Sequence, residues 1–260
     1  MRHLRAIVIA SEEGRPRSSL AGRKLLAILG GWLLASGALG GITFLAARAI
    51  SPEWGREPRN VSPIIIAEVY AAFVGVAALL SGRTFFANVA LRSVSLRSVL
   101  VAFPAWALAY ATAALAHVVF NPLIGPWSGT VNLLRATGSD DGRLAQTGPV
   151  LAMIILVRAC ALAPLGEELL FRGALFNWLR QHLSARWTIG ITAALFAMIH
   201  GFLPLLPLAF MLGVAAGTIR ERSGSTIPTI VVHVVHNILM VAFSYATTGW
   251  SARLPPWGHP

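Results

Sequence analysis

The segment LLAILGGWLLASGALGGITFLAA, residues 25–47, decides the fold class of this chain, because it is long, apolar and free of charged residues. An apolar run of 18 or more residues is long enough to cross the hydrocarbon core of a bilayer as an α-helix. A cleaved signal peptide has a shorter apolar core, of about 7–15 residues. We therefore expect residues 25–47 to form a first membrane-spanning helix that stays in the protein.

The composition of the whole chain points the same way. Charged residues make up 12% of the 260 residues, hydrophobic residues 56%, and the mean hydropathy is +0.69. A soluble domain has about 25% charged residues. Further apolar runs follow the first one, and together they predict an all-α, polytopic transmembrane helical bundle of about seven spans. The predicted spans are 25–47, 64–80, 99–120, 150–182, 187–202, 205–219 and 227–245.

The polar segments divide the chain into four predicted parts. A basic N-terminal segment, 1–24, precedes the N-terminal spans and an external loop, 25–147; a second membrane domain, 148–247, precedes a tail, 248–260. The net charge of +11 comes from arginines spread over short loops, not from a basic domain with interleaved aromatic residues. This pattern excludes nucleic acid as a partner and indicates contact with anionic lipid headgroups. The positive-inside rule predicts a multi-pass protein of the cell (cytoplasmic) membrane with its N-terminus in the cytoplasm.

Three glutamates lie inside apolar runs: Glu68, Glu167 and Glu168. Ionisable groups are costly within a span and are functional candidates for that reason. Adjacent helical residues point about 100° apart, so Glu167 and Glu168 cannot share one task. Arg172 follows Glu168 by four residues, which is the favourable order for an ion pair on one helix face. Glu167 is then free to act as a general base. The alternative is one ion-pair network that ends a span.

Histidines in two later spans supply partners for Glu167. His233 and Asn237 are four residues apart, hence on one helix face, and offer two hydrogen-bond donors to a developing oxyanion. At about 1.5 Å per residue from the predicted cytoplasmic helix ends, these two residues, Glu167 and His200 lie in the same zone of the bilayer. We therefore predict that the four side chains form one site.

Three motifs occur in order in the second half: Glu167-Glu168-Leu-Leu-Phe-Arg172, Phe196-Ala-Met-Ile-His200 and His233-Val-Val-His-Asn237. Their order and spacing resemble the CPBP family (CAAX protease and bacteriocin-processing, or Abi). The resemblance covers roughly residues 150–245. It implies that Glu167 and His200 activate the hydrolytic water and that His233 and Asn237 stabilise the oxyanion. It also implies that Glu168 and Arg172 support the site.

These observations predict an intramembrane endopeptidase. Its substrate would be a peptide bond of a membrane-associated or C-terminally lipidated protein or peptide. The alternative is a non-catalytic membrane immunity or scaffold protein that keeps the protease fold, although a scaffold does not need four polar groups in the bilayer. A proton-relaying transporter often has paired halves with matching broken helices, which this sequence lacks.

The sequence leaves metal dependence open. CPBP proteins are often described as metalloproteases, and Glu167, His200 and His233 could give zinc three ligands and an open position. The HExxH spacing is absent, however, and the same residues can act without metal. We favour a metal-free glutamate mechanism, with no certain cofactor and zinc as the alternative. The single cysteine excludes a disulfide framework, and the only aspartates, Asp140 and Asp141, share one predicted external loop, which excludes an intramembrane aspartyl pair.

Overall fold

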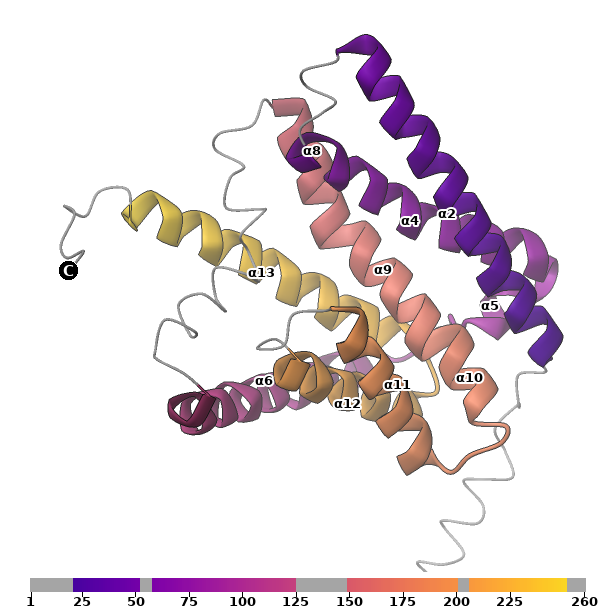
Figure 1. Cartoon of the computed structure of the whole chain (residues 1–260). Helices are drawn as coiled ribbons and strands as arrows, with labels where there is room; N and C mark the ends of the chain where they lie inside the picture. Colours follow the sequence, from indigo (N-terminus) through magenta and orange to yellow (C-terminus); the bar gives the residue numbers. More distant parts are fainter. Residues whose placement is uncertain (1–20, 52–57, 125–148, 201–205, 252–260) are drawn as a thin grey trace, which may run out of the picture.

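The computed structural model describes residues 21–51, 58–124, 149–200 and 206–251, and these residues form helices and short turns without any strand. The described part therefore has the predicted all-α architecture, with one helical stretch for each of the seven predicted spans (Figure 1). The elements are α2 (Gly22–Ile50), α4 (Pro58–Ser81), η1 (Gly82–Thr84), α5 (Phe85–Asn88), α6 (Leu96–Ile124), α8 (Pro149–Val157), η3 (Arg158–Leu162), α9 (Ala163–Glu168), η4 (Leu169–Leu175), α10 (Phe176–Leu179), α11 (Ala185–Ile199), α12 (Leu206–Ser223) and α13 (Ile227–Ser251).

Several predicted segments lie outside the described residues. They are the first 20 residues of the N-terminal segment, most of the external loop, the junction 201–205 between two predicted spans, and the end of the tail from residue 252.

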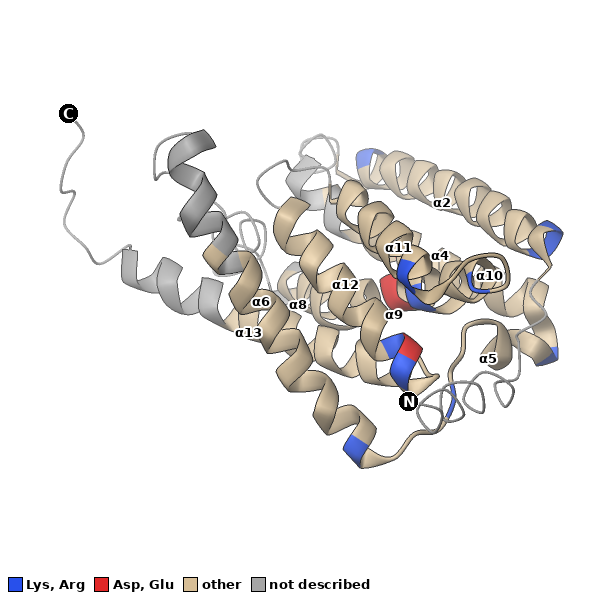
Figure 2. Ribbon diagram, turned by 90° about the horizontal axis from the view of Figure 1, so that it is seen from below, with Lys and Arg blue, Asp and Glu red and all other residues tan. Residues whose placement is uncertain are grey.

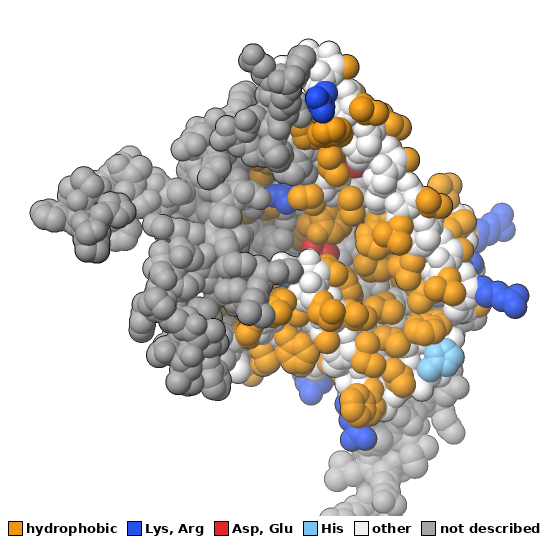
Figure 3. Space-filling model, in the orientation of Figure 1, with side chains coloured by type: hydrophobic (Ala, Val, Ile, Leu, Met, Phe, Trp, Pro, Cys, Tyr) orange, Lys and Arg blue, Asp and Glu red, His pale blue; other side chains and the backbone are white. Residues whose placement is uncertain are grey.

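Within the residues that the structure describes, three helices are long and apolar enough to cross a membrane: Gly22–Ile50, Ile64–Asn88 and Leu96–Ala113. Large apolar side chains on these helices point outward, among them Leu34, which is 78% exposed, and Leu79, which is 83% exposed. Figure 3 shows hydrophobic side chains spread over the described face of the molecule. Lys and Arg lie mostly at helix ends, whereas the acidic stretch of α9 lies within the bundle (Figure 2). The protein is therefore a membrane protein whose apolar surface faces lipid.

The predicted span 150–182 forms one long helix, from α8 to α10, that runs through the bundle (Figure 1). Two π-helical segments, η3 and η4, interrupt its α-helical winding. In η3 the N–H of Ala163 donates to the carbonyl of Arg158, five residues back, and Pro164 has no N–H to offer the next carbonyl. That carbonyl, of Ala159, instead accepts a hydrogen bond from Asn237 Nδ2 on α13 at 2.8 Å.

A second helix donates to η4 in the same way. The N–H of Phe176 donates to the carbonyls of Gly173 and Phe171 and passes over the carbonyl of Arg172. Arg220 Nε on α12 donates to that carbonyl at 3.0 Å. Since buried backbone carbonyls need donors, each π segment is tied to a neighbouring helix, η3 to α13 and η4 to α12.

A short turn fixes where α13 begins. Gly224 has a φ of +69°, a left-handed conformation that glycine adopts at little cost. After it, Ser225 Oγ donates to the carbonyl of Arg92 at 2.7 Å, and the N–H of Thr226 donates to the carbonyl of Ala90 at 2.9 Å. These bonds attach the start of α13 to the segment between α5 and α6. They therefore determine the position of α13 along its axis, and with it the position of His233 in the bundle.

Candidate active site

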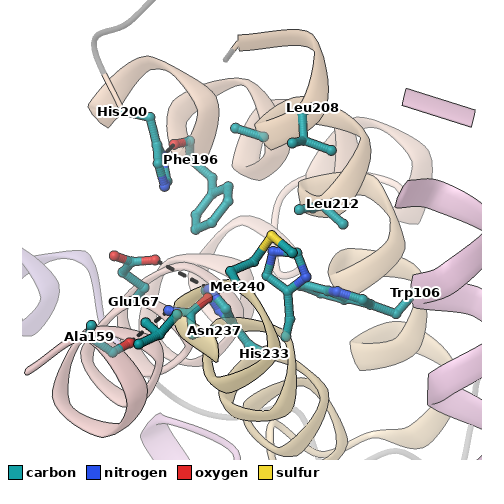
Figure 4. Close-up of a pocket in the computed structure, with 13 residues that line it drawn as sticks. Trp106, Ala159, Glu167, Phe196, His200, Leu208, Leu212, His233, Asn237 and Met240 are labelled. Atoms are coloured by element: carbon teal, nitrogen blue, oxygen red, sulfur yellow. Dashed lines mark hydrogen bonds and ion pairs between the residues drawn. The ribbon is translucent and has the colours of Figure 1, made fainter. Parts of the chain in front are cut away.

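A cavity of about 250 Å³ lies between the long helix, α6, α11, α12 and α13. All four predicted catalytic residues line it: Glu167 from α9, His200 at the end of α11, and His233 and Asn237 from α13 (Figure 4). The remaining wall is mostly apolar, with side chains that include Trp106, Phe196, Leu208, Leu212, Met240 and Val241. The cavity thus combines a small polar cluster with an apolar wall, as ligand sites commonly do.

Glu167 is buried, and its two carboxylate oxygens have different neighbours. Oε1 accepts a hydrogen bond of 2.6 Å from the hydroxyl of Tyr70 on α4. Oε2 lies 3.9 Å from His233 Nε2. Tyr70 is not among the site residues predicted from the sequence. The only sequence signal is a phenol group in the middle of the apolar run 64–80, and its partner is 97 positions away.

His200 presents one ring nitrogen to the cavity. Its Nδ1 is 2.7 Å from the carbonyl of Phe196 in the preceding turn, so Nδ1 carries the proton and donates it to this bond. In the neutral form of the ring, Nε2 then carries the lone pair. Figure 4 shows the ring directed toward the Glu167 carboxylate across the cavity. Glu167 and His200 both line the cavity of about 250 Å³, which is large enough to hold a water molecule.

His233 belongs to a buried chain of three polar groups. Its Nδ1 lies 3.0 Å from Glu168 Oε1, and the same oxygen accepts a bond of 3.0 Å from Arg172 Nη1. Glu168 and Arg172 are fully buried, and the guanidinium also lies 4.3 Å from the ring centroid of Phe196. The predicted pair of Glu168 and Arg172 is therefore present, and the carboxylate also holds the His233 ring with Nε2 toward Glu167.

The charges of this cluster are nearly balanced. Glu167 and Glu168 supply two carboxylates and Arg172 one guanidinium, and a second guanidinium, of Arg158, is close enough to act electrostatically on Tyr70, the partner of Glu167. A buried charge is tolerated only when it is paired and hydrogen-bonded. The Glu168 carboxylate, which accepts from both Nδ1 and Arg172, is the partner that an imidazolium at His233 needs.

Asn237 has a structural contact in addition to its position on the cavity. Its Nδ2 donates to the carbonyl of Ala159, the group that lacks a donor because of Pro164. An amide nitrogen carries two hydrogens, so one N–H of Asn237 is engaged and one is available to a substrate oxygen. We predicted that His233 and Asn237 both direct hydrogen-bond donors into one site. For Asn237, only the second N–H of the side chain is available for that role.

His236, in the third motif, lies among aromatic rings. Its ring centroid is 5.8 Å from that of Trp106 and 5.5 Å from that of Tyr110. No hydrogen bond or ion pair of His236 is described. This imidazole contributes to the wall of the cavity between α6 and α13.

The fit of the residues to zinc can be judged from their spacing. Two ligand atoms of tetrahedral zinc lie roughly 3.4 Å apart, given metal–ligand bonds of about 2.0–2.2 Å. Glu167 Oε2 and His233 Nε2 are 3.9 Å apart, and Glu167 Oε1 already accepts from Tyr70. Within the described part of the chain, no group of three or more His, Cys, Asp or Glu side chains is placed to hold a metal ion. Glu167, His200 and His233, the alternative zinc ligands, do not fit a tetrahedral site in this arrangement.

Residues 149–239 match the family model described as type II CAAX prenyl endopeptidase, Rce1-like. No curated protein and no solved structure matches the chain. The matched segment begins at α8 and ends within α13, and it contains Glu167, His200, His233 and Asn237. This match confirms the family resemblance predicted from the three motifs. Residues 149–239 of this membrane protein are therefore similar to an Rce1-like type II CAAX prenyl endopeptidase domain.

Proposed function

We propose that this protein is an intramembrane endopeptidase that hydrolyses a peptide bond of a membrane-associated or C-terminally lipidated protein or peptide. One observation carries the proposal: Glu167, His200 and His233 come from three different helices and line one cavity inside an apolar bundle. Uncompensated polar groups are costly there, and these have partners: Tyr70 donates to Glu167, and Glu168, itself paired with Arg172, bonds to His233.

The chemistry begins with a water molecule between Glu167 and His200. A proton of this water passes to the Glu167 carboxylate as the water oxygen attacks the carbonyl carbon of the substrate, and the Nε2 lone pair of His200 accepts the hydrogen bond that orients the water. The carbonyl oxygen gains a negative charge. A protonated His233 Nε2 and the available N–H of Asn237 are the donors for that charge. When the C–N bond breaks, the proton held by Glu167 passes to the amine nitrogen.

We propose this mechanism without a metal ion, because each proton transfer has a donor and an acceptor among the chain's own residues. Exhaustive chelation should then leave turnover unchanged. Activity that is lost on chelation and returns with added zinc would contradict the metal-free mechanism and leave the protease proposal intact.

We also propose that the protein lies in the cytoplasmic membrane with its N-terminus in the cytoplasm. With the N-terminus in the cytoplasm, the connections after the second, fourth and sixth predicted spans face the cytoplasm too, and these connections meet at one end of the bundle. Lys24 Nζ donates to Thr84 Oγ1, Arg180 pairs with Glu221 at 3.0 Å, and Ser225 bonds to Arg92. A common location for these basic loops supports the orientation that the positive-inside rule predicts.

The deciding experiment is the Glu167→Gln substitution. We expect it to abolish cleavage, lowering kcat by at least about 10²–10⁴-fold, because glutamine cannot accept the proton of water. Glu68→Gln is the matched control: Glu68 lies in α4, accepts a hydrogen bond from Thr43 on α2 and does not line the cavity. Peptides from membranes of cells with the wild-type protein and with each variant, compared by mass spectrometry, report the cleavage.

A Glu167→Gln protein that folds and still cleaves would end the proposal. Fold is checked by the thermal midpoint in detergent. A pattern in which Glu68→Gln abolishes the same cleavage and Glu167→Gln leaves it intact would also contradict the assignment, because it would place the chemistry at the α2–α4 contact.

A further inference from the structure

We infer that Tyr70, on α4, is a positioning residue for Glu167: it holds one carboxylate oxygen so that the other faces the cavity. The inference rests on the proposed function, because it assigns Tyr70 a role only in the orientation of the proposed general base. It also goes beyond the matched segment, since Tyr70 lies outside residues 149–239.

The hydrogen bond itself is the first support. The Tyr70 hydroxyl donates to Glu167 Oε1 at 2.6 Å, a distance typical of an O–H···O⁻ bond to an ionised carboxylate. The other oxygen, Oε2, lies 3.9 Å from His233 Nε2. A carboxylate on a flexible side chain can rotate about its last bond. One fixed oxygen removes this freedom and leaves Oε2 as the acceptor that faces the site.

The backbone beside Glu167 provides the second support. Gly166 precedes Glu167, and a Cβ atom added to it would lie 2.7 Å from Tyr70 Cδ1 and 3.1 Å from Tyr70 Cβ. The tyrosine ring therefore packs directly on the backbone of α9, at a distance that only glycine permits. Glycine in a helix interior costs about 1 kcal/mol relative to alanine. At this position the missing side chain allows the phenol group to reach the carboxylate.

The third support is that α4 is fixed at this height. Trp32 Nε1 on α2 donates to the carbonyl of Val69, the residue before Tyr70, at 2.8 Å. The Trp32 ring also packs edge-on against Phe73, with centroids 5.6 Å apart. Contacts from α2 thus fix the turn of α4 that carries Tyr70.

The test is Tyr70→Phe, which removes the hydroxyl and keeps the ring on Gly166. We expect kcat, measured well below the thermal midpoint of the variant, to fall about 10- to 100-fold, as for the loss of a hydrogen bond to a charged group, with KM unchanged. Tyr110→Phe is the matched control, because the Tyr110 hydroxyl contacts Met240 Sδ at 3.8 Å and no carboxylate. Cleavage is measured on a membrane peptide that the wild-type protein releases and the Glu167→Gln protein does not.

A second variant tests the packing. Gly166→Ala should push the ring away and lower kcat as Tyr70→Phe does. Both substitutions break the same hydrogen bond. The kcat of the double variant should therefore be no lower than that of the less active single variant, and the two losses should not multiply. If Gly166→Ala fails to fold, Tyr70→Phe alone decides.

The outcomes separate the two proposals. Turnover of Tyr70→Phe equal to that of Tyr110→Phe, with Glu167→Gln inactive, overturns the role of Tyr70 and leaves the protease standing. A lower thermal midpoint for Tyr70→Phe with an unchanged kcat in the folded protein also overturns it, because the hydroxyl would then stabilise the fold alone. Activity in Glu167→Gln removes the proposed function itself.

Discussion

The first membrane helix, α2, exposes most of its large apolar side chains, whereas the helix that carries Glu167 and Glu168 buries its charged ones. In α2 the buried residues are Leu25, Ile28 and Gly40, and leucines such as Leu34 are exposed. In α9 and η4 nearly every residue is buried, and Glu168 and Arg172 are completely so. Lipid is as apolar as leucine, so burial of leucine gains little there, whereas polar groups are driven together. Among the described residues, the three helices that satisfy the length and hydropathy requirement for a span all precede residue 114, whereas Glu167, His200, His233 and Asn237 follow them.

The largest effect expected from this contrast is on the stability of Arg172→Met. The substitution leaves Glu168 as a buried carboxylate without its guanidinium, which should lower the free energy of unfolding by about 3–5 kcal/mol. Arg48→Met on α2 is the matched control, because Arg48 is exposed and contacts the Phe44 ring at 5.6 Å. Unfolding of both variants in mixed micelles measures the difference. Equal stabilities would mean that the buried charge at Glu168 is not held by Arg172.

A smaller effect is expected for Glu168→Gln, measured as activity. Glutamine can still accept one hydrogen bond, but it lacks the charge that supports an imidazolium at His233. We expect kcat to fall about 100-fold, which corresponds to about 2.7 kcal/mol. The Glu68→Gln protein serves again as the control in an apolar run. Full activity of Glu168→Gln in a folded protein would show that His233 works as a neutral ring.

Two glycines give the next comparison. A Cβ at Gly213 would lie 2.8 Å from Ala193 Cα, where α11 and α12 pack closely, whereas a Cβ at Gly30 on α2 would meet nothing within 4 Å. Gly213→Ala should therefore destabilise the protein by about 1–3 kcal/mol, and Gly30→Ala should stabilise it by about 0.5–1 kcal/mol. Unfolding curves measured side by side test the signs. A stabilising Gly213→Ala would contradict the close approach of the two helices.

The smallest effect is expected for Leu34→Ala. Leu34 is 78% exposed on α2, so its loss should change the free energy of unfolding by less than about 0.5 kcal/mol. The same unfolding assay measures it. A loss several times larger would show that this face of α2 is covered by protein and not by lipid.

Local spacing was sufficient to predict part of this site. Residues four positions apart lie on the same face of a helix. This spacing was enough to predict the pair of Glu168 and Arg172 and the common face of His233 and Asn237. The number and class of the helices follow from the lengths of the apolar runs. The meeting of Glu167, His200 and His233 was predicted from their similar depth and from the family resemblance, because depth alone does not say which helices are neighbours.

Other contacts could not be predicted from the sequence. The bond from Tyr70 to Glu167 joins residues 97 positions apart, and neither has a periodic signature. The missing N–H of Pro164 is visible in the sequence, but the donor that compensates for it, Asn237, depends on how α13 packs against η3. Such pairings are properties of tertiary packing, which residue spacing within one helix does not determine.

The two π segments affect the direction in which the Glu167 and Glu168 side chains point around the helix axis. A π turn holds an extra residue compared with an α turn, so η3 and η4 each shift the direction of all side chains that follow. Between them lie only the six residues of α9, and the flanking turns are tied to α13 and α12. Insertion or deletion of one residue within α9 would turn Glu167 by about 100° relative to these ties. The length of this short segment is thus as restrictive as its composition, and in it even a one-residue change in length should be more damaging than most substitutions.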